Sequence, residues 1–270
     1  MRPARETIAA LVILMILAPD AAVFAQGLTA EEIMRRSNLA FYYAGDDMKA
    51  RVLMRLISKD GAERVRELTM LRKDLQEGGA QRYFIYFHRP PDVRDMTFMV
   101  WKYPGKDDDR WLYIPALKLV RRIAANDKRS SFVGSDFSYE DVSGREVEED
   151  AHKLVREDRQ GERETYVLAS LPRDPGSVDF GRKLSWIDKA TWLPLKEEYY
   201  DKRGDLSRVF TADELSQIQG FWTITKRTMR NVQTGHRTEA AFQETRYNLK
   251  LPPDLFTERS LRAPPPELTR

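Results

Sequence analysis

The sequence RYFIYFHRPPDVRDMTFMVWKY, residues 82–103, holds two strand-length runs separated by Pro90 and Pro91. Both runs carry apolar side chains on both faces: Tyr83, Phe84, Ile85, Tyr86 and Phe87, then Met96, Phe98, Met99, Val100, Trp101 and Tyr103. An antiparallel sheet usually alternates apolar and polar residues, because one face meets the core and the other meets water. Strands without that alternation need cover on both faces, or an interior hollow on one. The pattern therefore favours a curved sheet that closes toward a barrel around a ligand cavity.

The rest of the chain continues as a β protein with one early helix. A helix is predicted over residues 31–41, after the N-cap residue Thr29, and a period of two begins at Met48. Further strand-like segments follow at short intervals: 63–73, 82–88, 96–103, 110–114, 164–171, 182–188, 195–201, 207–214, 221–231 and 237–247. Turn pairs such as Asp60-Gly61 separate them, which is typical of an antiparallel meander and not of βαβ units.

Residues 111–141, WLYIPALKLVRRIAANDKRSSFVGSDFSYED, begin as an apolar strand and continue as a loop. Pro115 ends the strand pattern, because proline cannot donate a hydrogen bond to a neighbouring strand. Phe132, Phe137 and Tyr139 then stand among glycine and serine residues, and from this composition we expect no helix. A loop with three aromatic side chains needs an apolar surface to lie on. We interpret residues 132–141 as an aromatic flap over the sheet.

The N-terminus has the layout of an export signal. Arg2 and Arg5 precede an apolar run at 8–18 that is too short to span a bilayer, and Ala25 ends a plausible cleavage site. We therefore expect a signal peptide at 1–25, a single β domain at 26–260 and a Pro-rich flexible tail at 261–270. Because the chain has no cysteine, it offers neither a disulfide nor a lipid-modified cysteine. The predicted location is the periplasm, for a soluble protein without a lipid anchor.

The ionisable residues give weak support for chemistry. The three histidines lie in separate segments without ligand spacing, so we predict no metal site and no cofactor. The net charge of +3 is too small to indicate nucleic-acid binding. Asp136 and Glu140 lie beside aromatic residues, as the carboxylates of glycoside hydrolases do. We favour a role in anchoring the flap, through a turn at Asp136 and an ion pair of Glu140 with an arginine. No catalytic residue is assigned, and the protein is predicted not to be an enzyme.

The chain resembles the outer-membrane lipoprotein-sorting family, the LolA-like periplasmic carriers, in the branch associated with RND or MMPL-type exporters. WLYIPA at 111–116, RRI at 121–123 and FVGSDFSYED at 132–141 carry the resemblance. It implies a mainly β fold with few helices, in which a strongly curved antiparallel sheet forms an incomplete, half-open β-barrel capped by an N-terminal helix and loops. It also implies transfer of a lipid or acylated lipoprotein toward the outer membrane, with an inner-membrane exporter as partner and transient membrane contact.

Three groups of candidate site residues follow. The candidate wall of a lipid-binding cavity is Phe84, Tyr86, Phe98, Trp101, Trp111 and Tyr113. The candidate gate consists of Phe132, Phe137 and Tyr139 in the flap. Arg121 and Arg122 are candidate mouth residues that face headgroups or a membrane partner. The sequence leaves open which face of each strand points inward, because a register shift of one residue exchanges the two faces.

Two alternative functions remain open at this point. One is a cell-envelope hydrolase of glycan or lipid that uses Asp136 and Glu140. The other is an accessory subunit of an exporter that carries nothing. An interior filled by side chains, without a cavity large enough for an acyl chain, would favour the accessory subunit.

Overall fold

The computed structural model describes residues 27–269, so the predicted signal peptide lies outside the described residues. Its helices are α1 (Ala30–Tyr42), α2 (Tyr139–Ser143), α3 (Glu258–Arg262) and α4 (Pro266–Thr269), with short 3-10 turns η1 (Pro115–Leu117), η2 (Ala125–Asp127), η3 (Val147–Glu149) and η4 (Pro253–Phe256). Its strands are β1 (Asp47–Ile57), β2 (Glu63–Asp74), β3 (Gln81–Arg89), β4 (Thr97–Lys102), β5 (Asp109–Ile114), β6 (Leu119–Ile123), β7 (Asp150–Gln160), β8 (Arg163–Pro172), β9 (Phe180–Asp188), β10 (Pro194–Asp201), β11 (Leu206–Ile218), β12 (Phe221–Asn231) and β13 (Arg237–Tyr247).

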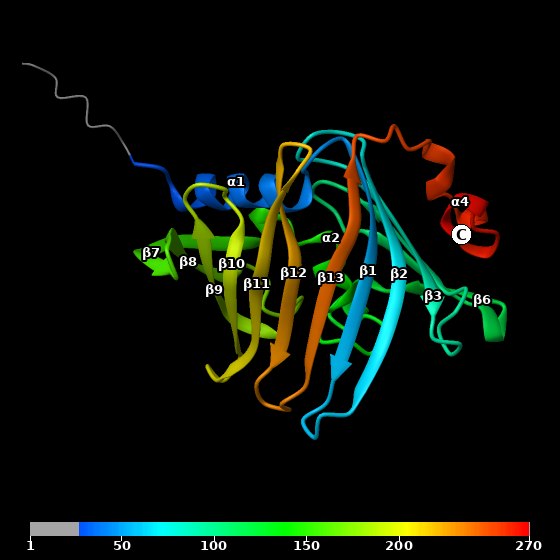
Figure 1. Ribbon diagram of the computed structural model, residues 1–270. Helices are drawn as coiled ribbons and strands as arrows, with labels where there is room; N and C mark the ends of the chain where they lie inside the picture. Colours follow the sequence, from blue (N-terminus) through cyan, green and yellow to red (C-terminus); the bar gives the residue numbers. More distant parts are fainter. Residues whose placement is uncertain (1–26, 270) are drawn as a thin grey trace, which may run out of the picture.

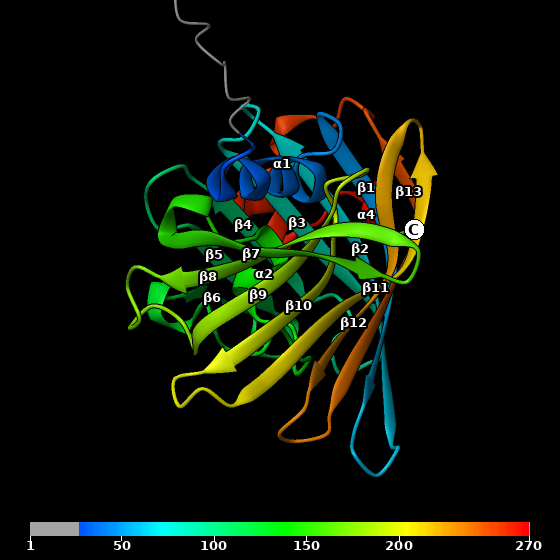
Figure 2. The same ribbon diagram turned by 90° about the vertical axis from the view of Figure 1, so that its left-hand side faces the viewer.

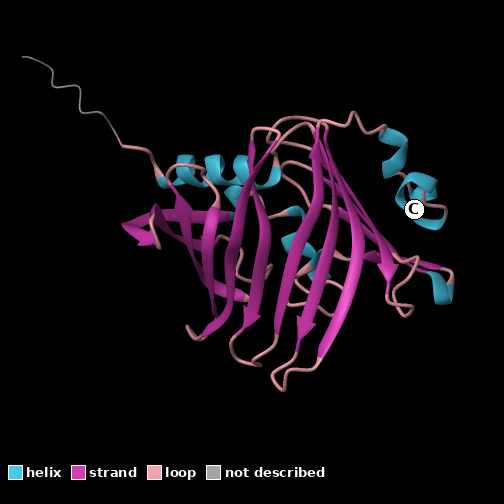
Figure 3. Ribbon diagram, viewed as in Figure 1, coloured by secondary structure: helices cyan, strands magenta, loops and turns pink. Residues whose placement is uncertain are grey.

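These strands form one 13-stranded antiparallel sheet in the order β6-β5-β4-β3-β2-β1-β13-β12-β11-β10-β9-β8-β7. The sheet is strongly curved, and its edge strands β6 and β7 do not pair with each other (Figure 1 and Figure 3). The fold prediction of a curved, incompletely closed antiparallel sheet with few helices is confirmed. The sheet remains open and does not close into a barrel.

The strand order explains why a loop crosses the concave side. The chain starts in the middle of the sheet at β1, builds outward to the edge β6, and later returns from the opposite edge β7 to β13, which pairs with β1. Residues 124–149, here called the crossover, connect the two edges and contain the flap. Seen from the side, α1 and α2 lie within the curve of the sheet (Figure 2). The topology therefore places the flap inside the concavity.

The expectation that the flap contains no helix is wrong, because α2 begins within it. The Ser138 side chain accepts a hydrogen bond from the Asp141 backbone N–H at 3.1 Å, and the Asp141 carboxylate accepts one from the Ser138 N–H at 2.7 Å. This reciprocal cap satisfies two N–H groups that would otherwise lack partners at the helix start. Gly144 ends the helix after Ser143. This cap stabilises the start of α2, although the glycine- and serine-rich residues before it have little tendency to form a helix.

The sequence analysis did not predict β6 and β7, the two edge strands. Every residue of β7 except Asp150 is at least partly exposed, so it lacks the apolar alternation that identifies a half-buried strand. In β6 only Ile123 is buried. Charged side chains on short or exposed edges also hinder pairing with other chains, which agrees with the many charged residues of β7 and with Arg121 and Arg122 on β6.

The doubly apolar strands are covered on both faces. On the concave face, inward side chains of β1–β5 pack against the flap in the main hydrophobic core. On the convex face, Phe84, Met99 and Trp111 pack against residues 251–269, here called the C-terminal cover. Part of the predicted flexible tail at 261–270 packs in this second core, where Leu261 and Leu268 are 0% and 2% exposed. A third cluster holds α1 against β8 and β9.

Candidate functional site

The concave apolar face and the flap form the centre of the candidate site. Phe132 is 3% exposed, and its ring centroid lies 5.3 Å from that of Phe98 and 5.9 Å from that of Phe87. Tyr139 also packs against Phe98, with the ring centroids 5.2 Å apart. Phe137 belongs to the same core. The structure thus brings the three predicted gate residues together with one predicted wall residue, Phe98.

The other five predicted wall residues lie on the convex face. Phe84, Tyr86 and Trp111 belong to the core beneath the C-terminal cover, and Trp101 and Tyr113 pack at its margin. The structure therefore does not bring the six predicted wall residues into one cavity. Side chains alternate along each strand, and both faces of these strands are apolar, so the sequence contains no signal that separates them. The concave positions on these strands are Tyr83, Ile85, Phe87, Phe98, Val100 and Leu112.

Polar contacts tie the flap to distant strands. The Asp136 carboxylate accepts hydrogen bonds from Thr238 at 2.7 Å and contacts His236 Nδ1 at 2.6 Å, both at the start of β13. The Asp141 carboxylate forms an ion pair of 3.1 Å with Arg208 on β11. β11 and β13 lie beside Asp136 and Asp141 because the second half of the chain folds back and pairs with the first. Asp136 and Asp141 therefore act as long-range anchors of the flap.

Glu140 lies in a buried ion network at the other side of α2. Its carboxylate is 2.8 Å from Lys128 Nζ and 3.3 Å from an Arg145 nitrogen, and Glu149 contacts the same two cations. Burial opposes the charge on Lys128, but Glu140 and Glu149 raise its pKa above the ordinary lysine value. The predicted pairing of Glu140 with an arginine is present. Asp136 and Glu140 bind separate partners, so the structure does not assemble them as a carboxylate pair.

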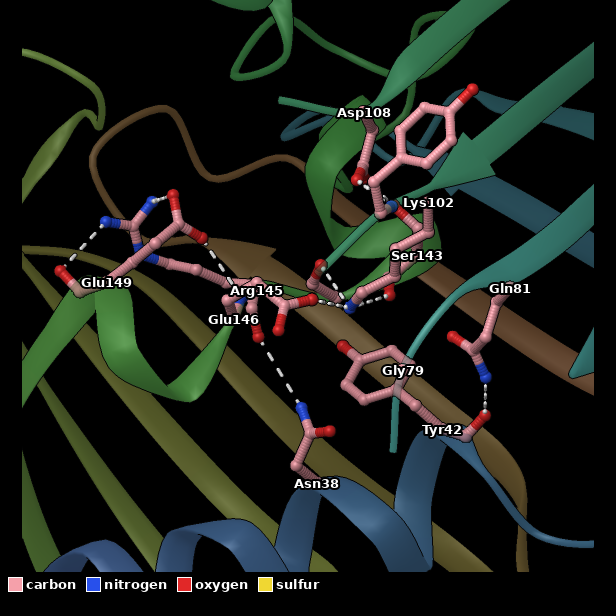
Figure 4. Close-up of polar contacts among 12 residues, drawn as sticks. Asn38, Tyr42, Gly79, Gln81, Lys102, Asp108, Ser143, Arg145, Glu146 and Glu149 are labelled. Atoms are coloured by element: carbon pink, nitrogen blue, oxygen red, sulfur yellow. Dashed lines mark hydrogen bonds and ion pairs between the residues drawn. The ribbon is translucent and has the colours of Figure 1, made fainter. Parts of the chain in front are cut away.

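Lys102 fixes the end of α2 from β4 (Figure 4). It is 1% exposed, and its Nζ donates hydrogen bonds to the carbonyl oxygens of Ser143 at 3.1 Å and Gly144 at 3.2 Å. Glu146 forms an ion pair of 3.1 Å with the same amine. A cation at a helix C-terminus satisfies carbonyl groups that have no partner within the helix. Lys102 thus attaches the C-terminal end of α2 to β4.

Three small hollows lie on the concave side. The polar hollow, about 80 Å³, lies between α1, the crossover and β9–β11 and is lined by charged residues that include Asp141, Lys183, Glu197 and Arg208. The middle hollow, about 60 Å³, lies under the end of α1. The apolar hollow, about 40 Å³, lies between the flap and β1–β3 and is lined mainly by aliphatic and aromatic side chains. Volumes of this size hold only a few water molecules, so side chains fill most of the space between the sheet, α1 and the flap in this conformation. A larger hollow of about 680 Å³ beside the crossover is lined mainly by polar and charged residues.

The polar hollow contains matched charges. Lys183 Nζ is 2.9 Å from Glu197, and the Tyr199 hydroxyl donates a hydrogen bond of 2.7 Å to the same carboxylate. Burial opposes the charge on Lys183, but Glu197 raises its pKa. Burial and then Glu197 raise the pKa of Tyr199 well above the ordinary value. The polar hollow is therefore electrostatically satisfied, as buried charges must be.

Sequence reasoning missed Arg227 on β12, which lines both the middle and the apolar hollow. It pairs with Ala240 across the strands and shares that residue's concave face. In the sequence it stands two residues before Met229, which is buried on the same face. The signal present in the sequence was this spacing of two, which puts a charged residue on the same strand face as a buried apolar residue.

The two predicted mouth residues lie on the edge strand β6. Arg121 is 3.6 Å from Asp127 and Arg122 forms an ion pair with Asp109, and both side chains are largely exposed. Neither lines any of the three hollows. Leu117 and Leu119 beside them are 66% and 48% exposed. This edge is therefore a basic and apolar surface set apart from the hollows.

Among residues 27–269, no helix combines the length and the apolar character needed to cross a bilayer. Within the same residues, the histidine, aspartate and glutamate side chains form no group of three or more with the arrangement of a metal site.

Comparisons with known proteins agree with the fold and with the resemblance in the sequence. The profile of a family described as "Uncharacterized protein" matches residues 79–263. A DUF1329 family protein from Desulfovibrio piger superposes with a TM-score of 0.80 at 28% identity, over 86% of this chain and 97% of that one. A putative outer membrane lipoprotein-sorting protein domain from Vibrio parahaemolyticus gives a TM-score of 0.80 at 29% identity, over 86% and 98%.

A third solved structure extends the likeness at the level of the fold. A LolA superfamily protein from Nitrosomonas europaea has a TM-score of 0.67 at 19% identity, over 86% of this chain and 99% of that one. Among curated proteins, none matches the chain. The profile match spans more than half of the chain, and the solved structures agree with it along nearly their whole length. The protein therefore belongs to the family whose profile matches residues 79–263, and its fold is LolA-like.

Proposed function

We propose that the protein is a soluble periplasmic carrier that binds a lipid or an acylated lipoprotein and transfers it toward the outer membrane. The observation that carries this proposal is an apolar concave face covered by a tethered loop segment instead of by strands. A strand would be held by backbone hydrogen bonds, whereas the flap can leave as a unit once its side-chain contacts break. The proposed cavity wall is the concave set around Tyr83, Ile85, Phe87 and Phe98.

The energetics of exchange support a carrier. Each flap side chain that leaves the core costs about 1.5–3 kcal/mol, and each buried methylene of an acyl chain returns about 0.8 kcal/mol. Displacing Phe132, Phe137 and Tyr139 is therefore offset by burying roughly six to eleven methylenes. A longer acyl chain adds to the net binding energy only through the methylenes beyond this number. Net binding therefore stays weak enough for release. In this scheme the three aromatic residues are the gate of the cavity.

A reversible cross-link of the flap tests the proposal. Asp136→Cys with Thr238→Cys replaces two short side chains that touch at 2.7 Å, in a chain with no other cysteine. We expect the oxidised protein to take up no labelled lipid from vesicles, and the reduced protein to take it up as the wild type does. The measurement is native mass spectrometry after separation from the vesicles. Equal uptake by both forms would show that the flap is no gate, and absence of uptake by the wild type would refute the carrier itself.

The edge strand β6 is the proposed contact with a membrane or a membrane partner. The exposed Arg121, Arg122 and Leu119 of β6, with Leu117 of the preceding η1, combine basic and apolar side chains, as membrane-surface segments do. An inner-membrane RND or MMPL-type exporter is the partner that the sequence resemblance suggests. Arg121→Glu with Arg122→Glu should reduce sedimentation with anionic vesicles at low salt. Unchanged sedimentation would remove this surface from the proposal.

A second candidate function is an exporter subunit that carries nothing. The observation that favours it is the filled interior, whose apolar hollow of about 40 Å³ cannot hold an acyl chain without movement of the flap. Protein purified from its own periplasm separates the two candidates. A carrier arrives with bound lipid in solvent extracts, whereas a non-carrying subunit arrives empty and co-purifies with its membrane partner.

A further inference from the structure

Arg227 projects from β12 into the concave interior, among aromatic rings. Its guanidinium carbon lies 4.4 Å from the ring centroid of Phe242 and 5.5 Å from those of Phe41 and Phe137. It lines the middle hollow on one side and the apolar hollow on the other. The side chain thus stands where the apolar hollow meets the region under α1.

Among the cations that line the three hollows, Arg227 differs in having no partner. Arg72, Arg145, Lys183 and Arg208 each form an ion pair with a carboxylate. Within residues 27–269, no hydrogen bond or ion pair reaches the Arg227 guanidinium, and its Nε atom is fully buried without an acceptor. Asp141 also lines the apolar hollow, but its carboxylate is already bound by Arg208 and by the Ser138 N–H.

An unpaired charge in this position is costly. Arg227 is half-buried, with its Nε fully out of water, and partial removal of a cation from water without a compensating anion destabilises the folded protein. Burial lowers the pKa of the Arg227 guanidinium, yet arginine stays protonated in proteins. The surrounding rings compensate only in part through cation–π contacts. A charge that lacks the pairing usual for buried groups is expected where a residue binds a ligand and does not stabilise the fold.

We propose that Arg227 binds the anionic group of the cargo, a phosphate or a carboxylate, while the acyl chain of the same molecule occupies the apolar hollow opened by the flap. This inference rests on the proposed carrier function and narrows its cargo to anionic amphiphiles. A guanidinium offers two parallel N–H donors to such a group, and the desolvated surroundings strengthen the pair. The apolar lining from Val52, Met70 and Ile85 then meets only methylenes.

Headgroup preference is the test. Wild-type protein is incubated with vesicles of either phosphatidylglycerol or phosphatidylcholine with identical acyl chains, and bound lipid is counted by native mass spectrometry. We expect about a tenfold preference for the anionic lipid, corresponding to about 1.4 kcal/mol. Arg227→Gln should abolish the preference. Arg230→Gln, an exposed arginine on the same strand, is the matched control and should retain it.

Two further measurements separate the outcomes. Inorganic phosphate alone should not raise the melting temperature, because the acyl chain supplies most of the binding; a rise abolished by Arg227→Gln would indicate a simple anion site and overturn the proposal. Arg227→Met should raise the melting temperature of lipid-free protein by relieving the unpaired charge. If it lowers the melting temperature and leaves headgroup preference unchanged, Arg227 is structural. Uptake of both lipids without preference refutes this inference alone, whereas uptake of neither refutes the carrier function.

Discussion

The flap and the C-terminal cover protect opposite faces of the same strands, but they are attached in different ways. The cover is held through carbonyl groups of its own backbone: Trp101 Nε1 donates to Phe256 O at 2.9 Å, and Thr97 Oγ1 donates to Leu261 O at 2.8 Å. The Asp47 carboxylate accepts a hydrogen bond of 2.7 Å from the Leu251 N–H at its start. Apart from the packing of its aromatic rings, the flap is tied to the distant strands by ionisable side chains, Asp136 and Asp141, that reach β13 and β11.

This difference separates a permanent cover from a removable one. Backbone contacts from buried residues persist until the whole element unfolds, whereas a segment tied by a few charged side chains can open locally at a lower free energy. The apolar hollow lies under the flap. The same apolar composition on the two faces of β3–β5 thus serves stability on the convex side and, in our proposal, binding on the concave side.

The largest expected effect is on the convex side. Phe256→Ala removes a ring that is 2% exposed and should lower the free energy of unfolding by about 4 kcal/mol. Denaturant unfolding measures the loss, and Leu117→Ala, at a position 66% exposed, is the neutral control. Lipid uptake per folded molecule should be unchanged. Faster lipid uptake by Phe256→Ala would mean that the C-terminal cover also opens. The cover and the flap would then not differ as a permanent and a removable cover.

An intermediate effect is expected from the flap anchor. Asp141→Asn leaves Arg208 partly buried without its carboxylate, which should cost about 2 kcal/mol. Hydrogen exchange should accelerate at the flap, at the Phe132 N–H above all, while the cover keeps its protection. The double variant Asp141→Asn with Arg208→Met removes the stranded charge and should recover global stability with the flap still loosened. Equal acceleration in flap and cover would contradict local opening.

The smallest expected effect comes from pH. His152 Nε2 donates a hydrogen bond of 2.8 Å to the Val147 carbonyl near the end of the crossover, and Nδ1 contacts the Ser170 hydroxyl at 2.8 Å. Burial lowers the pKa of His152 below the ordinary value of 6.5. The opened state therefore binds the proton more readily than the closed state. The stability that His152 contributes is present above pH 6.5 and is lost as the pH falls through its lowered folded pKa.

Hydrogen exchange across this range checks the prediction. The crossover around Val147 should exchange faster at pH 5 than at pH 7 after correction for intrinsic rates, and the C-terminal cover should not. His152→Gln keeps a hydrogen-bonding side chain without a titrating group, so it should remove the pH dependence. If the variant retains the dependence, another group controls it.

Much of the fold could be predicted because it depends on local patterns. The alternation in β1, the Asp60-Gly61 turn and the capping residue Thr29 act over a few residues, and each element appears where these signals stand. The edge strand β7 could not be predicted, because an exposed strand carries no apolar alternation. Its existence depends on pairing with β8, to which it is joined by a turn.

The candidate site was predictable only in part. The three aromatic residues of the flap were recognisable, because aromatic side chains in a glycine- and serine-rich loop need a partner surface. The cavity wall was not, since Phe84 and Phe98 look equivalent in sequence but lie on opposite faces. Arg227 becomes notable only when its lack of a partner is known, which is a property of three-dimensional packing.

The sequence by itself determined an antiparallel β protein with two apolar faces, an aromatic flap and a family likeness, because strand period, turn chemistry and motif identity are local. Only the tertiary structure decided which face is concave, which segment covers each face and which cation is left unpaired. The reason is that β1 pairs with β13 and the chain must then cross from β6 to β7. That long-range pairing selects one register among several that the apolar pattern would allow, and it places the flap and Arg227 on the same side of the sheet.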